Sequence, residues 1–362
     1  MFRAEDNFSN ETRQLILTKI PQLDNYVSSL RNAMKLSVES AVQGVVALIG
    51  LKYWLEKRCQ MRSIKQTAEL EEAMRQYANS DLGISAGARD GAMPVSPIFV
   101  RNFLDEFSAL NFGVVTAADI GFFMDVFLKR YFKGDLERLR VPIPIQNFLI
   151  GCLAPQKGET VMDPCCGVGD LLIGAMRYAG ARLMVAGIDY SRIASRIFLT
   201  RIALEYCADE SLGLPLSNNN FSSFDIAMCW PTMGRKLPPI DIGLGMPPRI
   251  AQMSEIQALL HCLMDTKPGG RIGVILPDVL IESESFGTFR QWFEAQADLV
   301  FSYGFNRGQI NFSFPSSRVS GLIFVKKDIG SHIGVNLAMA ADEPMESAVA
   351  AFDAFRKDMK FW

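Results

Sequence analysis

The stretch Val161-Met-Asp-Pro-Cys-Cys-Gly-Val-Gly-Asp170 decides the fold of this chain. Its first residues complete a short apolar run that predicts the end of a buried strand, and residues 171–176 predict a helix that packs back against it. Gly167 and Gly169 allow the turn between them to adopt positive φ and let a ligand approach the backbone. Asp163 is expected at the carboxyl end of the strand, where ligands bind in open α/β sheets. The alternative is an ordinary strand, turn and helix of an α/β core.

A second acidic residue follows at the end of a second apolar stretch. Residues 183–188 predict a strand that ends in Asp189, and residues 191–207 show the apolar spacing of a helix. In doubly wound folds an acid at this position hydrogen-bonds a ribose. Three more blocks complete the pattern, at residues 224–234, 258–270 and 271–278.

The order of these blocks and their residue patterns resemble those of the adenine-N6 DNA methyltransferases, in particular the modification subunits of type I restriction systems. The resemblance covers about residues 142–327. It implies an α/β, doubly wound, mostly parallel sheet of the S-adenosylmethionine-dependent methyltransferase fold, preceded by a helical N-terminal region. In that family the first block binds S-adenosylmethionine, the second its ribose, and the third holds the target adenine. The cofactor-binding residues that the resemblance implies here are Pro144, Asp163, Pro164, Gly167, Gly169, Asp189 and Asp225.

The chain departs from the family pattern just before the first strand. Type I modification subunits carry an aromatic-Thr-Pro segment that closes over the cofactor. Pro144 matches the proline of that segment, but Ile143 stands where the threonine is expected. A hydroxyl contact to the cofactor is therefore missing.

A larger departure lies in the third block, which in the family reads roughly Phe-Asp-x-x-x-x-Asn-Pro-Pro-Phe-Gly. Aligning Phe-Asp and Gly places Trp230, Pro231, Thr232 and Met233 at the four catalytic motif positions. The family asparagine and a main-chain carbonyl accept hydrogen bonds from the exocyclic amine, and the aromatic residue stacks on the flipped base. An indole has one donor and no acceptor, so Trp230 cannot replace the asparagine. Shifting the alignment by one residue offers only Cys229, a weak acceptor.

Three classes of function follow from this pattern. The first is a working methyltransferase with an unusual acceptor site, in which Trp230 stacks on a base or another substrate. The second is a catalytically inactive partner subunit that binds the cofactor or assembles with an active relative, and the lost motif favours it. The preceding loop, residues 217–223, also lacks the Gly-Asp pair that family members use near the adenine of the cofactor. A dinucleotide-dependent dehydrogenase is disfavoured because the turn lacks a third glycine in Rossmann spacing.

The charge balance indicates that DNA recognition depends on a partner protein. The chain has 362 residues and a formal net charge of -2, so no global attraction to DNA is expected. Local basic runs occur at residues 52–65 and 129–140, where a solvated helix face is the simpler explanation. No stretch is long enough for a separate target-recognition domain. We therefore expect a hetero-oligomer with a specificity subunit or an active methyltransferase, contacting DNA through that partner.

Neither a metal site nor a disulfide framework is indicated, because the seven cysteines contain no CxxC pair and the two histidines are far apart. Residues 1–10 are polar and do not resemble a signal peptide. The most apolar run, residues 41–51, is shorter than the ~20 residues that span a bilayer. A cytoplasmic protein without a membrane segment is therefore expected.

Five segments are predicted along the chain. Residues 1–79 form a helical region, residues 80–97 a glycine-rich linker or mobile loop, and residues 98–141 helices that lead into the core. The methyltransferase-like domain spans 142–328, with its last strands near 297–303 and 319–325. Residues 329–362 form a tail that contains one amphipathic helix.

Overall fold

The computed structural model describes residues 10–58, 60–61, 64–87, 95–112, 114–181, 183–206, 224–240, 247–306, 318–328, 333–339 and 342–362. It divides into two compact units, which we call the sheet unit and the helical unit. The sheet unit comprises Arg140–Tyr190 and Pro215–Trp362, and the helical unit comprises Arg3–Leu139 and Ser191–Leu214.

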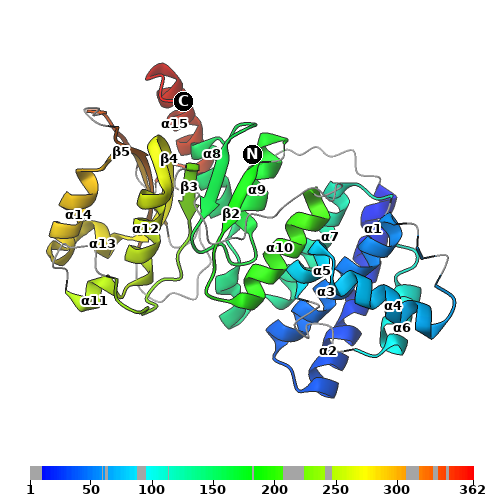
Figure 1. The fold of residues 1–362 in the computed structure, drawn as a ribbon. Helices are drawn as coiled ribbons and strands as arrows, with labels where there is room; N and C mark the ends of the chain where they lie inside the picture. The colour runs from blue at the N-terminus through cyan, green and yellow to red at the C-terminus, as the bar shows by residue number, and fades with distance from the viewer. Residues whose placement is uncertain are drawn as a thin grey trace. The chain divides into compact units, whose positions relative to one another are not determined.

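The strands of the sheet unit form one seven-stranded sheet in the order β2-β1-β3-β4-β6-β5-β7 (Figure 1). Their bounds are β1 Thr160–Asp163, β2 Met184–Gly187, β3 Phe224–Cys229, β4 Thr266–Pro277, β5 Ala297–Phe305, β6 Val319–Lys326 and β7 Leu337–Met339. Neighbours among β2, β1, β3 and β4 are parallel, as are β5 and β7, whereas β6 runs antiparallel to β4 and β5. The prediction of a doubly wound, mostly parallel α/β sheet is confirmed.

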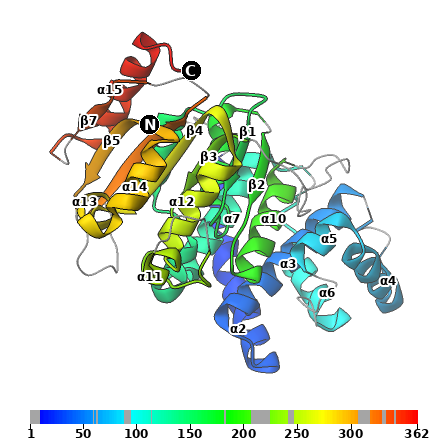
Figure 2. The ribbon, with the colours of Figure 1, turned by 60° about the vertical axis from the view of Figure 1, so that its left-hand side comes forward.

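Helices cover both faces of this sheet. Their bounds are α8 Ile143–Leu153, α9 Asp170–Ala179, α11 Pro248–Ala251, α12 Ser254–Asp265, α13 Asp278–Glu282, η4 Glu284–Phe286, α14 Gly287–Glu294 and α15 Met345–Asp358. On one face α12 buries its apolar side against β3 and β4, and α14 packs against β5 and β6; both helices lie in front of the strands in Figure 2. Burying each large apolar side chain contributes about 1.5–3 kcal/mol, so these helices hold the strand ends in place.

The other face is packed by α8 and α15 through stacked aromatic rings. Phe301 of β5 stacks on Phe352 of α15 with ring centroids 4.4 Å apart, and Phe148 of α8 lies 5.8 Å from Phe301. A Cβ atom at Gly321 of β6 would approach the Phe148 ring to 2.2 Å. Glycine at this position therefore lets α8 lie directly on the sheet.

The helical unit is built around α3. Its elements are α1 Asn10–Lys19, η1 Ile20–Gln22, α2 Leu23–Met34, α3 Val38–Lys57, α4 Thr67–Ala78, α5 Asp81–Ala86, α6 Pro97–Glu106, α7 Ala117–Tyr131, η3 Gly134–Leu139 and α10 Arg192–Tyr206. In the part of the chain that the structure describes, α3 alone is long and apolar enough to cross a membrane, and 83% of its most apolar window is buried. A mostly buried core helix meets the same criteria, so this is weak evidence for a membrane span.

Two boundaries differ from those expected. Helix α10 follows β2 along the chain but packs against α3, α5 and α7, and Arg201 forms a 2.6 Å ion pair with Asp125 of α7. The segment 80–97 contains α5, whose N-cap Ser80 accepts a hydrogen bond from Gly83, so its first part is a helix rather than a linker. Residues 88–94 of that expected linker lie outside the described residues, and Pro97 at its end is the first residue of α6.

Candidate functional site

The glycine turn has the geometry that its sequence predicts. β1 ends at Asp163, α9 begins at Asp170, and Gly167 and Gly169 adopt φ values of 53° and 89°. A side chain at either glycine would be strained in this left-handed region. The turn therefore needs glycine at both positions.

Main-chain hydrogen bonds join the glycine turn to the end of β2. Cys166 N donates to Ile188 O at 2.8 Å, and Ile188 N donates to Asp163 O at 3.0 Å. The carboxylate of Asp189 accepts from Gly167 N at 2.9 Å. The structure thus brings Asp163, Gly167 and Asp189 together at one edge of the sheet, as the sequence predicts.

Asp163 has the most perturbed environment of this edge. Its side chain is fully buried, Oδ1 accepts from Cys165 N at 2.9 Å, and Oδ2 has no hydrogen-bond partner among the described residues. Burial raises the pKa of Asp163 to about 8, with a smaller contribution from the neighbouring acids Asp189 and Asp170. An unsatisfied buried carboxyl oxygen indicates a missing partner, and a cationic or hydrogen-bond-donating ligand fits that role.

Asp170 connects the start of α8 to this turn. Its carboxylate accepts from Arg140 Nε at 2.6 Å and from Val141 N at 2.9 Å, which fixes the segment that enters α8. Pro144 therefore lies in the first turn of a helix anchored to the site, and Ile143 beside it is 63% exposed. Pro164 is buried directly after Asp163.

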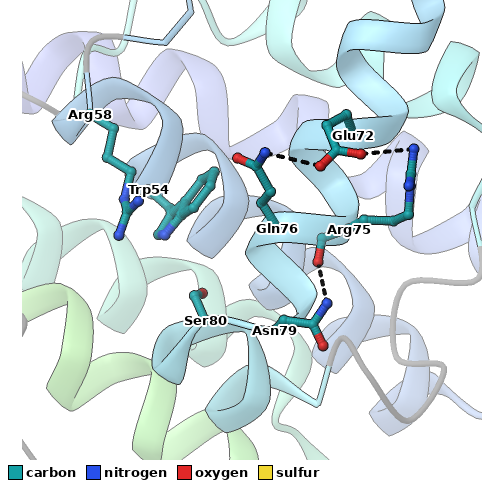
Figure 3. Close-up of a pocket in the computed structure, with 7 residues that line it drawn as sticks. All are labelled: Trp54, Arg58, Glu72, Arg75, Gln76, Asn79 and Ser80. Atoms are coloured by element: carbon teal, nitrogen blue, oxygen red, sulfur yellow. Dashed lines mark hydrogen bonds and ion pairs between the residues drawn. The ribbon is translucent and has the colours of Figure 1, made fainter.

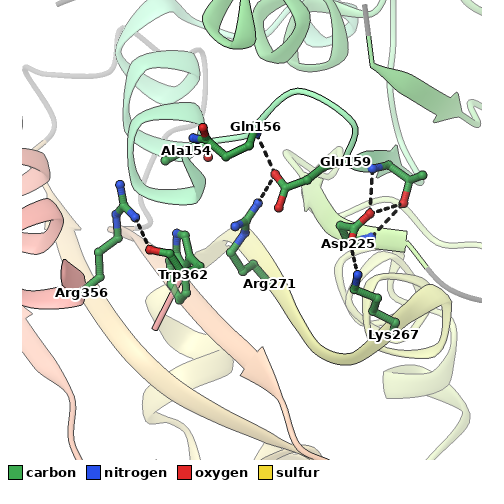
Figure 4. A network of polar contacts seen from close by, with 9 residues as sticks. Ala154, Gln156, Glu159, Asp225, Lys267, Arg271, Arg356 and Trp362 are labelled. Atoms are coloured by element: carbon green, nitrogen blue, oxygen red, sulfur yellow. Dashed lines mark hydrogen bonds and ion pairs between the residues drawn. The ribbon is translucent and has the colours of Figure 1, made fainter. Parts of the chain in front are cut away.

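The structure does not bring Asp225 to this site. Asp225 is the second residue of β3, and its Oδ2 accepts from Thr160 N at 2.9 Å and Thr160 Oγ1 at 2.8 Å (Figure 4). It also pairs with Lys267. Because β1 and β3 are parallel, Thr160 and Asp225 mark the amino edge of the sheet, opposite Asp163. The assignment of Asp225 to the cofactor site is therefore wrong.

The four motif positions after β3 lie beside the end of β1. Val161 and Met162 pair with Ile226 and Ala227, so the chain after Cys229 leaves the sheet near Asp163. Trp230 is only 6% exposed. The following Pro231 is buried, whereas Thr232 and Met233 are half-buried. A buried indole offers no open face on which an incoming base could stack.

This segment is held by main-chain contacts to the start of α12. Ser254 Oγ donates to Thr232 O at 2.5 Å, and Gly234 N donates to a carboxylate oxygen of Glu255 at 2.6 Å. Leu237 N donates to Gln252 O at 2.7 Å. Glu255 is 1% exposed, so its hydrogen bond to Gly234 is shielded from water. The backbone shape of the segment therefore does not depend on the side chains of the altered motif.

The thiols near the glycine turn are poor nucleophiles. Cys229 Sγ lies 3.7 Å from Cys262 Sγ. A hydrogen bond to Cys229 and burial raise the pKa of Cys165 well above its usual value, and burial raises the pKa of Cys262. Both thiols are therefore held in the protonated, unreactive form. Across the described ranges, no group of three or more His, Cys, Asp or Glu side chains is arranged to hold a metal ion.

The helical unit contains an open pocket of about 560 Å³ (Figure 3). Its lining residues come from the end of α3, from α4 and from the start of α5, and they are Trp54, Arg58, Glu72, Arg75, Gln76, Asn79 and Ser80. Arg58 lies 4.6 Å from the Trp54 ring, and Glu72 is paired with Arg75 and Gln76. The lining acid is thus already satisfied, and the pocket does not resemble a catalytic site.

Comparison with known proteins supports the fold. No model of a known protein family matches the sequence. A 2-phytyl-1,4-beta-naphthoquinone methyltransferase of Arabidopsis thaliana is 26% identical over 155 residues, which are 40% of this chain and 51% of that protein. The chain thus spans about half the length of this curated relative.

Two solved structures match along nearly their whole length. One, from Listeria monocytogenes, is assigned to the class I S-adenosylmethionine-dependent methyltransferases, with a TM-score of 0.64, 14% identity and coverage of 96% of this chain and 98% of that chain. The other is a type I restriction-modification methyltransferase subunit from Streptococcus thermophilus, with a TM-score of 0.63, 15% identity and coverage of 94% and 93%. The fold is that of the class I S-adenosylmethionine-dependent methyltransferases, and the resemblance to type I modification subunits is confirmed at the level of fold.

Several residues that shape the site were not singled out from the sequence. Asp170 carries a signal that could have identified it, because an acid in the first turn of a helix after a glycine is a common anchoring position. Ser254 and Glu255 carry no local signal, since their role depends on tertiary contact with a segment about twenty residues earlier.

Proposed function

We propose that this chain is an S-adenosylmethionine-binding subunit of a DNA-modifying assembly, and that its own acceptor site does not transfer a methyl group to adenine. The observation that carries the proposal is the contrast between two neighbouring strand ends. The turn after β1 keeps Asp163, Gly167 and Gly169, whereas the segment after β3 presents a buried Trp230.

The residues of the glycine turn fit the cofactor. S-adenosylmethionine supplies a sulfonium-bound methyl group and carries cationic and hydrogen-bond-donating groups. Asp163 has a buried carboxyl oxygen without a partner among the described residues, and Asp189 places a second carboxylate beside it. Asp189 would accept hydrogen bonds from the ribose hydroxyls. Asp170 would keep the α8 segment over the turn through its bonds to Arg140 and Val141.

The acceptor side lacks the group that adenine transfer requires. In the family an asparagine carbonyl accepts from the adenine amine, and the indole of Trp230 has no acceptor atom. A hydrogen bond with Cys165 lowers the pKa of the buried Cys229 thiol, but a hydrogen bond with Cys262 and burial outweigh it and raise that pKa well above the usual value. Losing one well-placed polar group in a transition state typically costs ~3 kcal/mol, or roughly a hundredfold or more in rate.

The proposed partners follow from the charge balance and from the structural relatives. A net charge of -2 gives the chain no general attraction to DNA. One relative of similar fold belongs to a study of complex assembly of a type I restriction-modification system, with a TM-score of 0.62 and 16% identity. We propose that this chain contacts DNA through a specificity subunit or an active methyltransferase.

Radiolabelled methyl transfer tests the proposal. The purified chain is incubated with S-adenosylmethionine labelled at the methyl group and with duplex DNA, and no label is expected on adenine. The double variant Trp230→Asn/Thr232→Pro rebuilds most of the amine-holding motif and is expected to reach only trace transfer when a competent partner is present, since Met233 offers no aromatic face. Robust adenine-N6 transfer by the wild-type chain would overturn the proposal.

A further inference from the structure

A tyrosine and an arginine meet across the end of β1. Tyr190 follows the acid at the end of β2, and Arg235 follows the segment that leaves β3. The guanidinium carbon of Arg235 lies 5.1 Å from the centroid of the Tyr190 ring, within the range of a cation–π contact. Because β1 lies between β2 and β3, this contact spans the strand end that carries Asp163 and the glycine turn.

The backbone on both sides of this contact is fixed. On the Tyr190 side, Ile188 both donates and accepts main-chain hydrogen bonds with the β1 end and the glycine turn. On the Arg235 side, Ser254 N donates to Arg235 O at 3.0 Å, and Leu237 N is bonded to the chain before α12. The movable parts of the contact are therefore the two side chains, which are both largely exposed.

We propose that Arg235 and Tyr190 form a clasp that closes over a ligand bound at the glycine turn and must open for its entry and exit. The inference rests on the proposed cofactor site. An ordinary surface contact could lie anywhere on the sheet unit. This contact instead joins a residue just after β2 to a residue in the segment after β3, and β1 with its glycine turn lies between those two strands.

A clasp that controls access to the site has a different kinetic effect from a side chain that binds the ligand directly. If opening is required both for entry and for exit, loosening the contact raises the association rate and the dissociation rate by the same factor. Loss of an exposed cation–π contact is expected to change each of these two rates by about two- to five-fold. The dissociation constant then stays constant, whereas damage to the binding site raises the dissociation rate alone and weakens binding.

Stopped-flow binding of S-adenosylmethionine to the full chain tests the clasp. Arg235→Ala and Tyr190→Leu are each expected to raise both rates about two- to five-fold. The double variant is expected to show no more than the single effect, because either change removes the same contact. Arg249→Ala is the matched control, since it removes the same charge from another exposed arginine of the sheet unit and is expected to leave both rates unchanged.

A second ligand separates the clasp from charge steering. S-adenosylhomocysteine lacks the sulfonium charge, so a purely electrostatic effect of Arg235 would differ between the two ligands, whereas a clasp affects both equally. Unchanged rates in Arg235→Ala, or a faster dissociation with weaker binding, would overturn the clasp while leaving the proposed function in place. Failure of the wild-type chain to bind either ligand would overturn the proposed function and the clasp together.

Discussion

Replacing Asp163 with Asn is expected to remove a strong pH dependence from the stability of the sheet unit. The Asp163 carboxyl is fully buried, and burial raises its pKa from 3.8 to about 8. Between these two values the folded protein keeps a proton that the unfolded chain has already lost. The stabilisation is therefore complete below pH 3.8 and is lost as the pH rises toward 8.

The size of the effect follows from one proton. Each pH unit inside this window changes the free energy of unfolding by about 1.4 kcal/mol, so wild-type stability contains a loss of about 2–3 kcal/mol between pH 5 and pH 7 from this group. Asparagine does not ionise there, and its amide oxygen can keep the hydrogen bond from Cys165 N. The free energy of unfolding of the variant is therefore expected not to show this decrease between pH 5 and pH 7.

Urea unfolding at pH 5, 6 and 7 measures the difference. Trp230, Trp292 and Trp362 belong to the sheet unit, whereas Trp54 belongs to the helical unit, so both proteins carry Trp54→Phe and the remaining fluorescence follows the unfolding of the sheet unit. All other titratable groups are identical in the two proteins and cancel when the variant is compared with wild type at each pH. Parallel profiles for the two proteins would refute the buried, proton-holding state of Asp163.

Three further predictions concern the same edge of the sheet. Asp189→Ala is expected to weaken S-adenosylmethionine binding by about 1–3 kcal/mol in calorimetry, because the ribose donors lose their acceptor; Asp225→Ala, at the opposite edge, is the matched control, and equal effects of the two would contradict the assignment. Wild-type affinity for the cationic cofactor is expected to rise with pH up to about 8 as Asp163 ionises, whereas the affinity of Asp163→Asn is expected to stay constant. Constant affinity of the wild-type protein over this range would count against a direct contact between Asp163 and the cofactor. Glu255→Ala is expected to speed amide exchange around Gly234 while the exchange of β3 stays slow, and unchanged exchange at Gly234 would show that its bond to Glu255 does not hold the segment.

The glycine turn was predictable because its signals are local. Gly167 and Gly169 lie between a short apolar run and a helical run, and only a turn with positive φ satisfies both. Asp189 was predictable for the same reason, since it directly follows an apolar run and lies just beyond the end of β2. Motif order therefore identified the strand ends that carry these residues.

Features that depend on strand direction or tertiary contact were not predictable. Asp225 lies at the start of β3, so its side chain is at the amino edge and pairs with Lys267. Apolar spacing identified α10 as a helix but does not say that it packs in the helical unit. The sequence shows an indole at Trp230, but only packing shows that it is buried.

Calorimetric titration of S-adenosylmethionine into the purified chain measures cofactor binding without requiring methyl transfer. We propose that Asp163, Gly167 and Asp189 form a working cofactor site, although the neighbouring acceptor motif is altered. Saturable binding at one site per chain is expected. Absence of binding at millimolar cofactor would contradict it and would mean that the fold serves only as a scaffold.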